Sequence, residues 1–290
     1  MQTLIPATLF TLMFALGLGL RGEALVLLRQ RPALVARVLI GTCLLVPLAA
    51  LLFLKSPLNQ LLSLPVKLAI ALMAISPSAP LTLRKAGRQG GDRELAALLQ
   101  LLAAAVAIVS IPLLADLFRA VFQLSGWDIQ PLEVAGQVLL MQGLPLVAGL
   151  LLRRGWPGLA DRLEAPLDRA ANLLLLSLAV LILSRSWTLL TTFLVGNLPG
   201  LACISLMVLL ALAIGWLLSG PQLRERTTVS LLTSTRNPGL ALLFASSHAQ
   251  GVVGLKLAIL VYVLVTVLLS VPFLKLHQRV LADSGMGIAG

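Results

Sequence analysis

The stretch Ser234-Thr235-Arg236-Asn237-Pro238-Gly239 decides how this sequence folds, because it interrupts an apolar run that is otherwise long enough to cross a membrane. The run covers residues 227–247. A residue before proline is disfavoured in the α conformation, whereas asparagine followed by proline is typical of an N-cap and the first position of a new helix. The sequence therefore predicts two half-helices separated by an unwound segment.

A second interruption, Ser76-Pro77-Ser78-Ala79-Pro80, lies within the apolar run 64–83. Its two prolines remove backbone donors and clash with the preceding turn. Unwound backbone at membrane depth is tolerated only where protein or a water-filled cavity covers it. The two breaks indicate a buried site, and the alternative is a pair of unrelated proline kinks.

The whole chain has the composition of an integral membrane protein. Of its 290 residues, 59% are hydrophobic and 11% are charged, and the mean hydropathy is +1.00. A helix of about 20 apolar residues crosses the ~30 Å hydrocarbon layer with its backbone hydrogen bonds satisfied. The apolar runs are long and continuous, which excludes a transmembrane β-barrel. The predicted fold is an all-α polytopic membrane protein, with one transmembrane domain over residues 1–280 and a short tail over 281–290.

Nine apolar segments are predicted to span the membrane, and the connections between them are short. They are residues 3–20, 33–54, 64–83, 95–118, 131–152, 170–187, 199–218, 227–247 and 252–274.

The basic residues predict the orientation of these spans. Sixteen of the 22 Lys and Arg residues lie in one set of alternate connections, five lie in the other set, and Arg236 lies in neither. Positive charges remain on the cytoplasmic side, so we expect the N-terminus outside and the C-terminus in the cytoplasm of a bacterial inner (plasma) membrane. The small scattered basic groups do not form one face, so the partner is the lipid bilayer and not nucleic acid.

The positions of the two breaks suggest internal symmetry. Each broken span is followed by one further span before its half of the chain ends. If the chain is two inverted repeats of five helices, with the first helix missing, the broken helix is the fourth in each repeat. Paired interruptions of this kind indicate a transporter binding site near the middle of the membrane.

Three motifs in this chain resemble those of the bile acid:sodium symporter family. They are Met13 to Leu20, then Pro77 to Thr82 with the following Gly91-Asp92, and Thr227 to Ala241. The chain is similar to the nine-span members, which lack the extra first helix of the ten-span members. The resemblance implies a core bundle with two crossing helices, a panel bundle that rocks against it, and sodium-coupled uptake of organic anions.

The residues depart from this family where it binds sodium. Leu232 and Arg236 stand where the family carries a glutamate and a glutamine, and Thr82 and Leu83 replace a Ser-Asn pair. Sodium needs several oxygen ligands. All eleven acidic residues lie in connections or at span ends, so we expect no metal site and no sodium coupling.

Arg236 is predicted to be a deep charge. It lies ten residues beyond Arg226, which at ~1.5 Å per residue places it about 15 Å into the membrane. Two interpretations remain open and are compatible. Either an anionic substrate balances the charge, aided by free N–H groups of the half-helix that begins at Pro238, or Arg236 replaces the lost sodium and bonds unwound carbonyls of the other broken helix.

The candidate site consists of polar residues in or beside the two breaks. Polar residues within spans are explained equally well by hydrogen bonds between helices. At the outer end of a span, His248 is predicted to be solvated. The predicted substrate-binding residues are Arg236, Asn237, Thr235, Ser234, Ser76, Ser78, Thr82 and Gln100, and the helix breaks are Pro77, Pro80, Pro238 and Gly239.

These features favour a secondary transporter of a small organic anion that works by alternating access. A non-transporting receptor or sensor on the same fold is the alternative. A membrane-embedded enzyme is disfavoured because the spans contain no catalytic constellation of nucleophile, base or paired carboxylates. We expect no cofactor.

Overall fold

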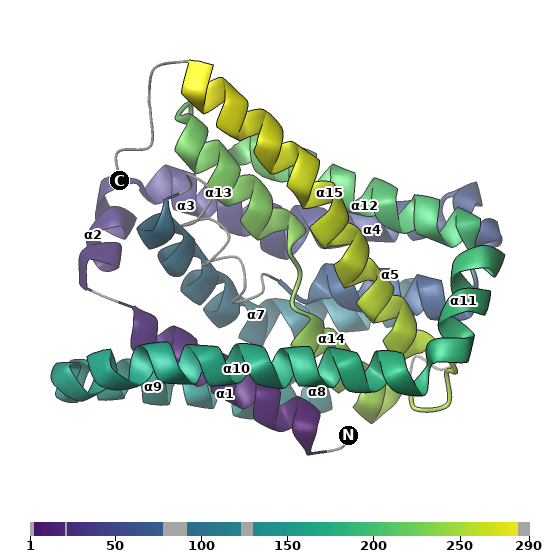
Figure 1. Ribbon diagram of the computed structural model, residues 1–290, viewed down its shortest axis with the longest axis horizontal. Coiled ribbons are helices and arrows are strands. Elements are labelled where there is room, and N and C mark those ends of the chain that lie inside the picture. Colours follow the sequence, from purple (N-terminus) through teal and green to yellow (C-terminus); the bar gives the residue numbers. More distant parts are fainter. Residues whose placement is uncertain (1–2, 21, 78–91, 123–129, 284–290) are drawn as a thin grey trace.

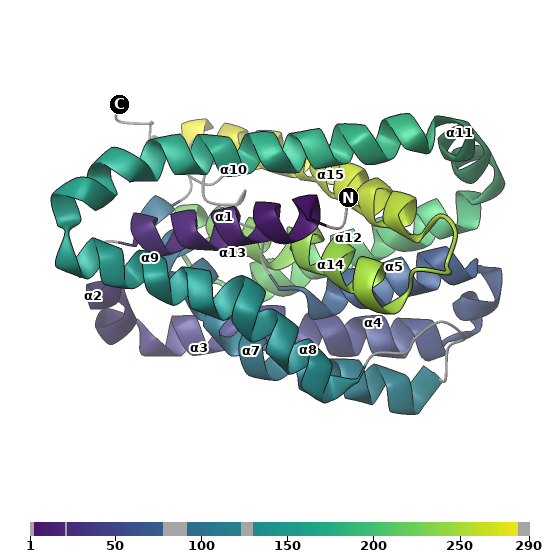
Figure 2. The same ribbon diagram turned by 90° about the horizontal axis from the view of Figure 1, so that it is seen from below.

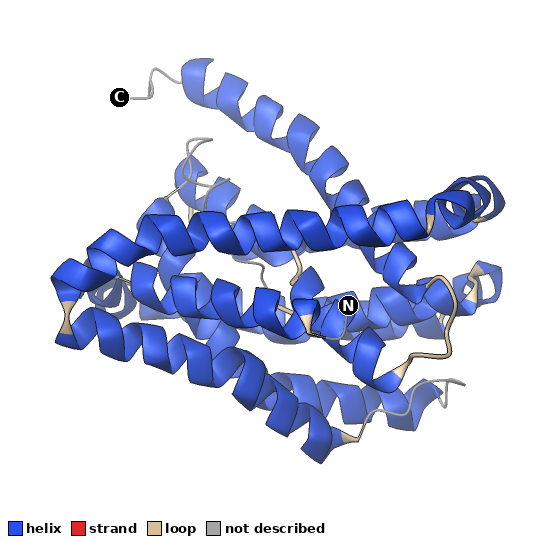
Figure 3. Cartoon of the chain, turned by 60° about the horizontal axis from the view of Figure 1, so that its bottom comes forward, coloured by secondary structure: helices blue, strands red, loops and turns tan. Residues whose placement is uncertain are grey.

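The computed structural model describes residues 3–20, 22–77, 92–122 and 130–283, and every regular element in these ranges is helical (Figure 3). The all-α fold is confirmed. Counting π segments η1 and η3 and the short 3-10 segment η2, the elements are α1 Leu4–Gly19, α2 Gly22–Gln30, α3 Pro32–Ile40, η1 Gly41–Leu45, α4 Val46–Lys55, η2 Pro57–Leu61, α5 Leu64–Ile75, α7 Arg93–Phe122, α8 Pro131–Val138, η3 Leu139–Gly143, α9 Leu144–Gly155, α10 Pro157–Arg185, α11 Trp187–Gly196, α12 Leu198–Leu218, α13 Leu223–Ser234, α14 Pro238–His248 and α15 Leu255–Asp283.

Six helical stretches within the described residues are long and apolar enough to cross a membrane. Three shorter apolar helices, α1, α5 and α11, accompany them. The chain is therefore an integral membrane protein. The six stretches are Pro32–Lys55, Glu94–Phe122, Pro131–Gly155, Pro157–Arg185, Leu198–Leu218 and Leu255–Lys275.

Two predicted boundaries need correction. The helix that carries the predicted span 170–187 is longer than that span, because α10 begins at Pro157, with proline in its first turn, and continues through a charged first half and the internal Pro166. Residues 188–198 were expected to be a connection, but most of them form α11, which ends before Asn197. Hydropathy alone registers neither a charged helix nor an apolar helix too short to span.

Helices α1, α9 and α10 pack on one another and form what we call the three-helix group (Figures 1 and 2). Helix α1 lies between the other two. It crosses α9 at Gly17 and Gly149 with the two backbones in contact. A Cβ on Gly17 would lie 3.0 Å from the Leu150 nitrogen, and one on Gly149 would lie 3.0 Å from the Leu18 nitrogen. Glycine at both positions is what allows the helices to come this close.

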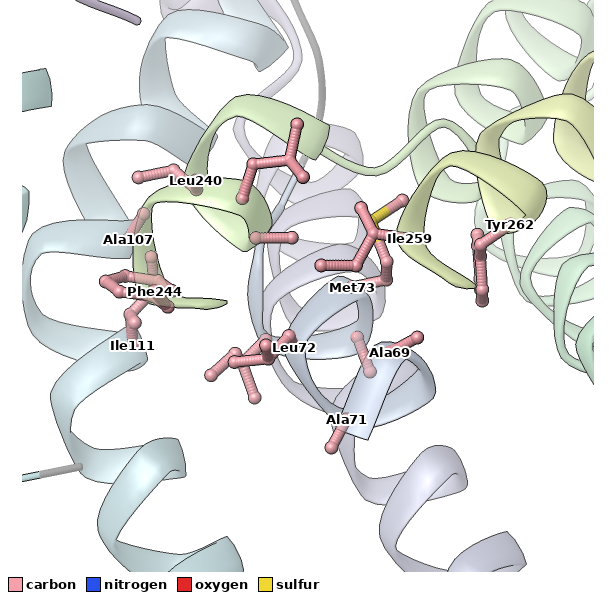
Figure 4. Packing of buried hydrophobic residues seen from close by; sticks show 14 of the residues in the cluster. Ala69, Ala71, Leu72, Met73, Ala107, Ile111, Leu240, Phe244, Ile259 and Tyr262 are labelled. Carbon is pink, nitrogen blue, oxygen red and sulfur yellow. The ribbon is translucent and has the colours of Figure 1, made fainter. Parts of the chain in front are cut away.

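Helices α4, α7, α12, α14 and α15 pack against α5, whose buried side chains form the centre of the hydrophobic core. Residues Leu68 to Ile75 of α5 are all at most 1% exposed. Figure 4 shows Leu72 and Met73 of α5 among residues of α7, α14 and α15, including Ile111, Phe244 and Ile259. Helix α5 thus carries the first break into the middle of the molecule.

Candidate functional site

The two helix breaks meet inside the molecule. Helix α5 ends at Ile75, and the chain between α13 and α14 is unwound at residues 235–237. The Asn237 N–H donates a hydrogen bond of 3.1 Å to the Ser76 carbonyl. This contact confirms that the breaks lie together. Ser78, Pro80 and Thr82 lie outside the described residues.

Asn237 caps the second half-helix as the sequence predicts. Its Oδ1 accepts hydrogen bonds from the N–H groups of Gly239, at 3.0 Å, and Leu240, at 3.3 Å, and Pro238 occupies the first turn. These N–H groups are therefore not free, which corrects the expectation that they would face an anionic substrate. The cap consumes the donors that a bound anion would need.

The Arg236 side chain is 1% exposed and lies among backbone carbonyls. Its Nε donates to the Met73 carbonyl at 3.0 Å, and its Nη2 donates to the Ala74 carbonyl. Its Nη1 donates to the Thr42 carbonyl at 2.9 Å, to Thr42 Oγ1 at 3.0 Å and to the Thr233 carbonyl at 3.5 Å. The prediction that Arg236 bonds carbonyls of the other broken helix is confirmed. A role in binding substrate stays a prediction.

Thr42 belongs to this site, and the sequence reasoning missed it. It lies in η1, where the Val46 N–H donates to the Gly41 carbonyl in the π-helical pattern. Pro47 comes five residues after Thr42 and has no N–H. The Thr42 carbonyl thus loses both of its usual helical donors and is available to Arg236. A proline five residues after a threonine in an apolar span was the sequence signal.

Three of the predicted binding residues keep polar atoms without a hydrogen-bond partner among the described residues. They are both amide atoms of Gln100, Nδ2 of Asn237 and Oγ1 of Thr235. Gln100 is 1% exposed. The other two hydroxyls are engaged in their own helices, because Ser76 donates to the Leu72 carbonyl and Ser234 to the Leu231 carbonyl. Gln100, Asn237 and Thr235 therefore keep polar atoms that are available to a ligand, whereas the hydroxyls of Ser76 and Ser234 already donate to backbone carbonyls.

Gln100 and Arg236 each follow, by the same number of residues, a hydrogen bond that joins their two segments. The Asp92 N–H donates to Thr228 Oγ1 at 2.8 Å, which joins the start of α7 to the second turn of α13, and the two helices pack together from there. Gln100 follows Asp92 by eight residues, and Arg236 follows Thr228 by eight. At ~1.5 Å per residue, Gln100 lies about 12 Å along α7 from this link, and Arg236 lies just beyond the end of α13 at Ser234.

His248 is not solvated as predicted. Its side chain is 5% exposed, and Nε2 lies 3.2 Å from Gln137 Oε1 of α8. His248 is the last residue of α14, and its side chain packs against α8.

The profile of the Sodium Bile acid symporter family matches residues 6–193 of this chain. The chain belongs to this family. A comparison with curated proteins gave no match. The matched residues of this sodium bile acid symporter family member include the first break and Gln100, whereas the second break follows them. The resemblance seen in the sequence is confirmed, and the family is one of membrane transporters and not of enzymes.

Proposed function

We propose that this protein is a secondary transporter of a small organic anion, that it works by alternating access, and that its substrate site lies where the two breaks meet. The observation that carries the proposal is the hydrogen bond between Asn237 and Ser76 beside the buried Arg236. Two half-helices that meet within a membrane domain give a transporter a polar site surrounded by apolar protein.

The substrate is bound by neutral amides in the field of a fixed positive charge. At least four of the five N–H groups of Arg236 are needed for its five oxygen contacts. Its charge still favours an anion nearby, because attraction between charges extends beyond hydrogen-bond distance. The amides of Gln100 and Asn237 supply the direct contacts, since their polar atoms lack partners among the described residues.

The three-helix group is one of the two moving bodies. Arg153 of α9 ties it together by donating to the Leu18 carbonyl of α1 at 2.5 Å and to Asp161 at 2.5 Å and Glu164 at 2.8 Å on α10. In the rest of the molecule, an ion pair between Arg31 and the buried Glu225 joins the start of α3 to α13. Each body is thus held internally and rocks as a unit.

The nine-span topology with an outside N-terminus is part of the same proposal. The six long helical stretches account for six spans, and α1, the span begun by α5, and the pair α13 and α14 account for the others. The inverted repeats are supported by α7 and α15, which each follow a break and each contain an internal proline, Pro112 and Pro272.

Transport does not depend on sodium in this proposal. Leu232 is fully buried and offers no side-chain oxygen, and Arg236 places a positive charge at the break. Two unit charges ~4 Å apart repel by about 4 kcal/mol at an effective dielectric constant of 20. That repulsion weakens sodium binding several hundredfold.

Uptake by purified protein in liposomes tests the transport function. A panel of labelled organic acids is supplied outside the vesicles, and we expect at least one to enter faster than in protein-free liposomes. Replacing Gln100 with Leu should abolish this uptake, while Gln222→Ala, at an exposed position, should leave it unchanged. Tight binding of an acid without any uptake would instead identify a receptor.

A further inference from the structure

The five oxygen atoms around Arg236 form a site whose chemistry is that of a cation-binding site. Four are backbone carbonyls, of Thr42, Met73, Ala74 and Thr233, and the fifth is Oγ1 of Thr42. We call these atoms the oxygen cage. They come from η1, α5 and α13, so three segments distant in the sequence converge on one point. Carbonyl and hydroxyl oxygens are the ligands that monovalent and other hard cations prefer.

Three of the four cage carbonyls, those of Met73, Thr42 and Thr233, lack the N–H that would pair with them in a regular helix. Pro77 follows Met73 by four residues and has no N–H, and Pro47 leaves the Thr42 carbonyl without its donor in the same way. The α-helical donor for the Thr233 carbonyl is the Asn237 N–H, which donates to Ser76 instead. The second break and the π segment thus each contribute a carbonyl without a backbone donor, whereas the Met73 carbonyl at the end of α5 accepts a 3.1 Å hydrogen bond from the Ser76 N–H in addition to the one from Arg236.

The local electrostatics also require a positive charge there. Helices α5 and α13 both end at the cage, at Ile75 and Ser234. The C-terminus of a helix carries a partial charge of roughly −0.5, so two helix ends supply about one negative charge. No carboxylate among the described residues is hydrogen-bonded to Arg236. The helix ends and carbonyl dipoles therefore favour a cation at this point and offset part of the guanidinium charge.

We propose that the oxygen cage is a binding site for a monovalent cation, and that the protein fills it permanently with its own Arg236 guanidinium. When the side chain is shortened, the site takes a free cation from solution. The inference rests on the proposed function in one respect, because a permanently bound cation would explain transport without sodium. The cage itself is defined by contacts within the protein, so it can be tested without any substrate.

Thermal unfolding of the purified protein in detergent provides the test. Arg236→Ala should lower the unfolding midpoint, and guanidinium chloride at millimolar concentration should raise it again, with an increase that grows with the logarithm of concentration. Sodium or potassium chloride should act in the same direction, relative to choline chloride at equal ionic strength. The unmodified protein should show no such response to any of these cations.

Arg236→Met is the matched control, because it fills the space with an uncharged apolar side chain. Its midpoint should not respond to added cations. A lysine ammonium can donate hydrogen bonds to the oxygen cage and a methionine side chain cannot, so Arg236→Lys should be more stable than Arg236→Met. If Arg236→Ala folds only when guanidinium is present, the proposal is supported.

Two outcomes would overturn the proposal. One is an Arg236→Ala protein whose midpoint is the same in guanidinium, sodium, potassium and choline. The other, decisive if the alanine variant cannot be prepared in any medium, is a methionine variant at least as stable as the lysine variant. Either result can be obtained while uptake of an organic acid persists, so failure of the cage and failure of the transport function are distinguishable.

Discussion

At the scale of single residues, Asn237 combines two roles that can be separated. Its Oδ1 caps α14, whereas its Nδ2 has no partner among the described residues and is assigned to the substrate. An aspartate at this position keeps an oxygen that accepts the capping hydrogen bonds, but it has no N–H group to donate to a substrate. The two roles therefore respond differently to two substitutions at the same position.

We expect Asn237→Asp to fold with nearly normal stability but to transport poorly, because an aspartate caps a helix as well as asparagine does. Asn237→Ala should lose both roles and lower the free energy of unfolding by about 0.5–2 kcal/mol. Unfolding and uptake measurements on both variants check this. Normal uptake by Asn237→Asp would show that Nδ2 does not contact the substrate.

Gln100 and Gln142 allow a second matched comparison. Both are 1% exposed, but Gln142 donates a 2.6 Å hydrogen bond to the Ala104 carbonyl, whereas Gln100 has no partner among the described residues. Gln142→Leu should destabilise the protein by about 0.5–1.5 kcal/mol, because it removes a buried hydrogen bond between α7 and η3. Gln100→Leu should not destabilise it, since it removes an unsatisfied buried amide, yet uptake should fall. Equal losses of stability would contradict the assignment of Gln100 to the site.

At the scale of elements, the crossing of α1 and α9 determines the shape of the three-helix group. Gly17 and Gly149 have no space for a Cβ, whereas a Cβ on Gly136 of α8 would meet no atom within 4 Å. We expect Gly149→Ala to reduce stability by about 1–3 kcal/mol through overpacking. Gly136→Ala should be neutral or stabilise the helix by up to about 1 kcal/mol. Thermal unfolding of the two variants checks the crossing, and equal effects would refute it.

The elements also show how far a sequence can be interpreted alone. The second break and its Asn237-Pro238 cap were predictable, because the preferences that create them are local. The position of Thr42 was not, because it depends on η1 bringing its carbonyl to a residue 194 positions away. The first N–H groups of α14 were also expected to be free, although they donate to Asn237 Oδ1, and the reason is simpler. The same asparagine that marks the helix start also satisfies its donors.

At the scale of the whole molecule, the proposed topology places the two ends of the chain on opposite sides of the membrane. Alternate connections differ strongly in Lys and Arg content, and this asymmetry sets orientation. Reporter domains active on only one side, fused to each terminus, should indicate an outside N-terminus and a cytoplasmic C-terminus. A cytoplasmic signal from both ends would mean an even number of spans and would remove the basis for the inverted repeats.

The central claim is that this member of a sodium symporter family has a fixed charge at the break, provided by Arg236, in place of a coupling sodium. The most direct measurement is the initial rate of organic-acid uptake into proteoliposomes, with sodium chloride replaced by choline chloride at constant ionic strength. We predict equal rates in the two media. A strict requirement for sodium in the unmodified protein would contradict the claim.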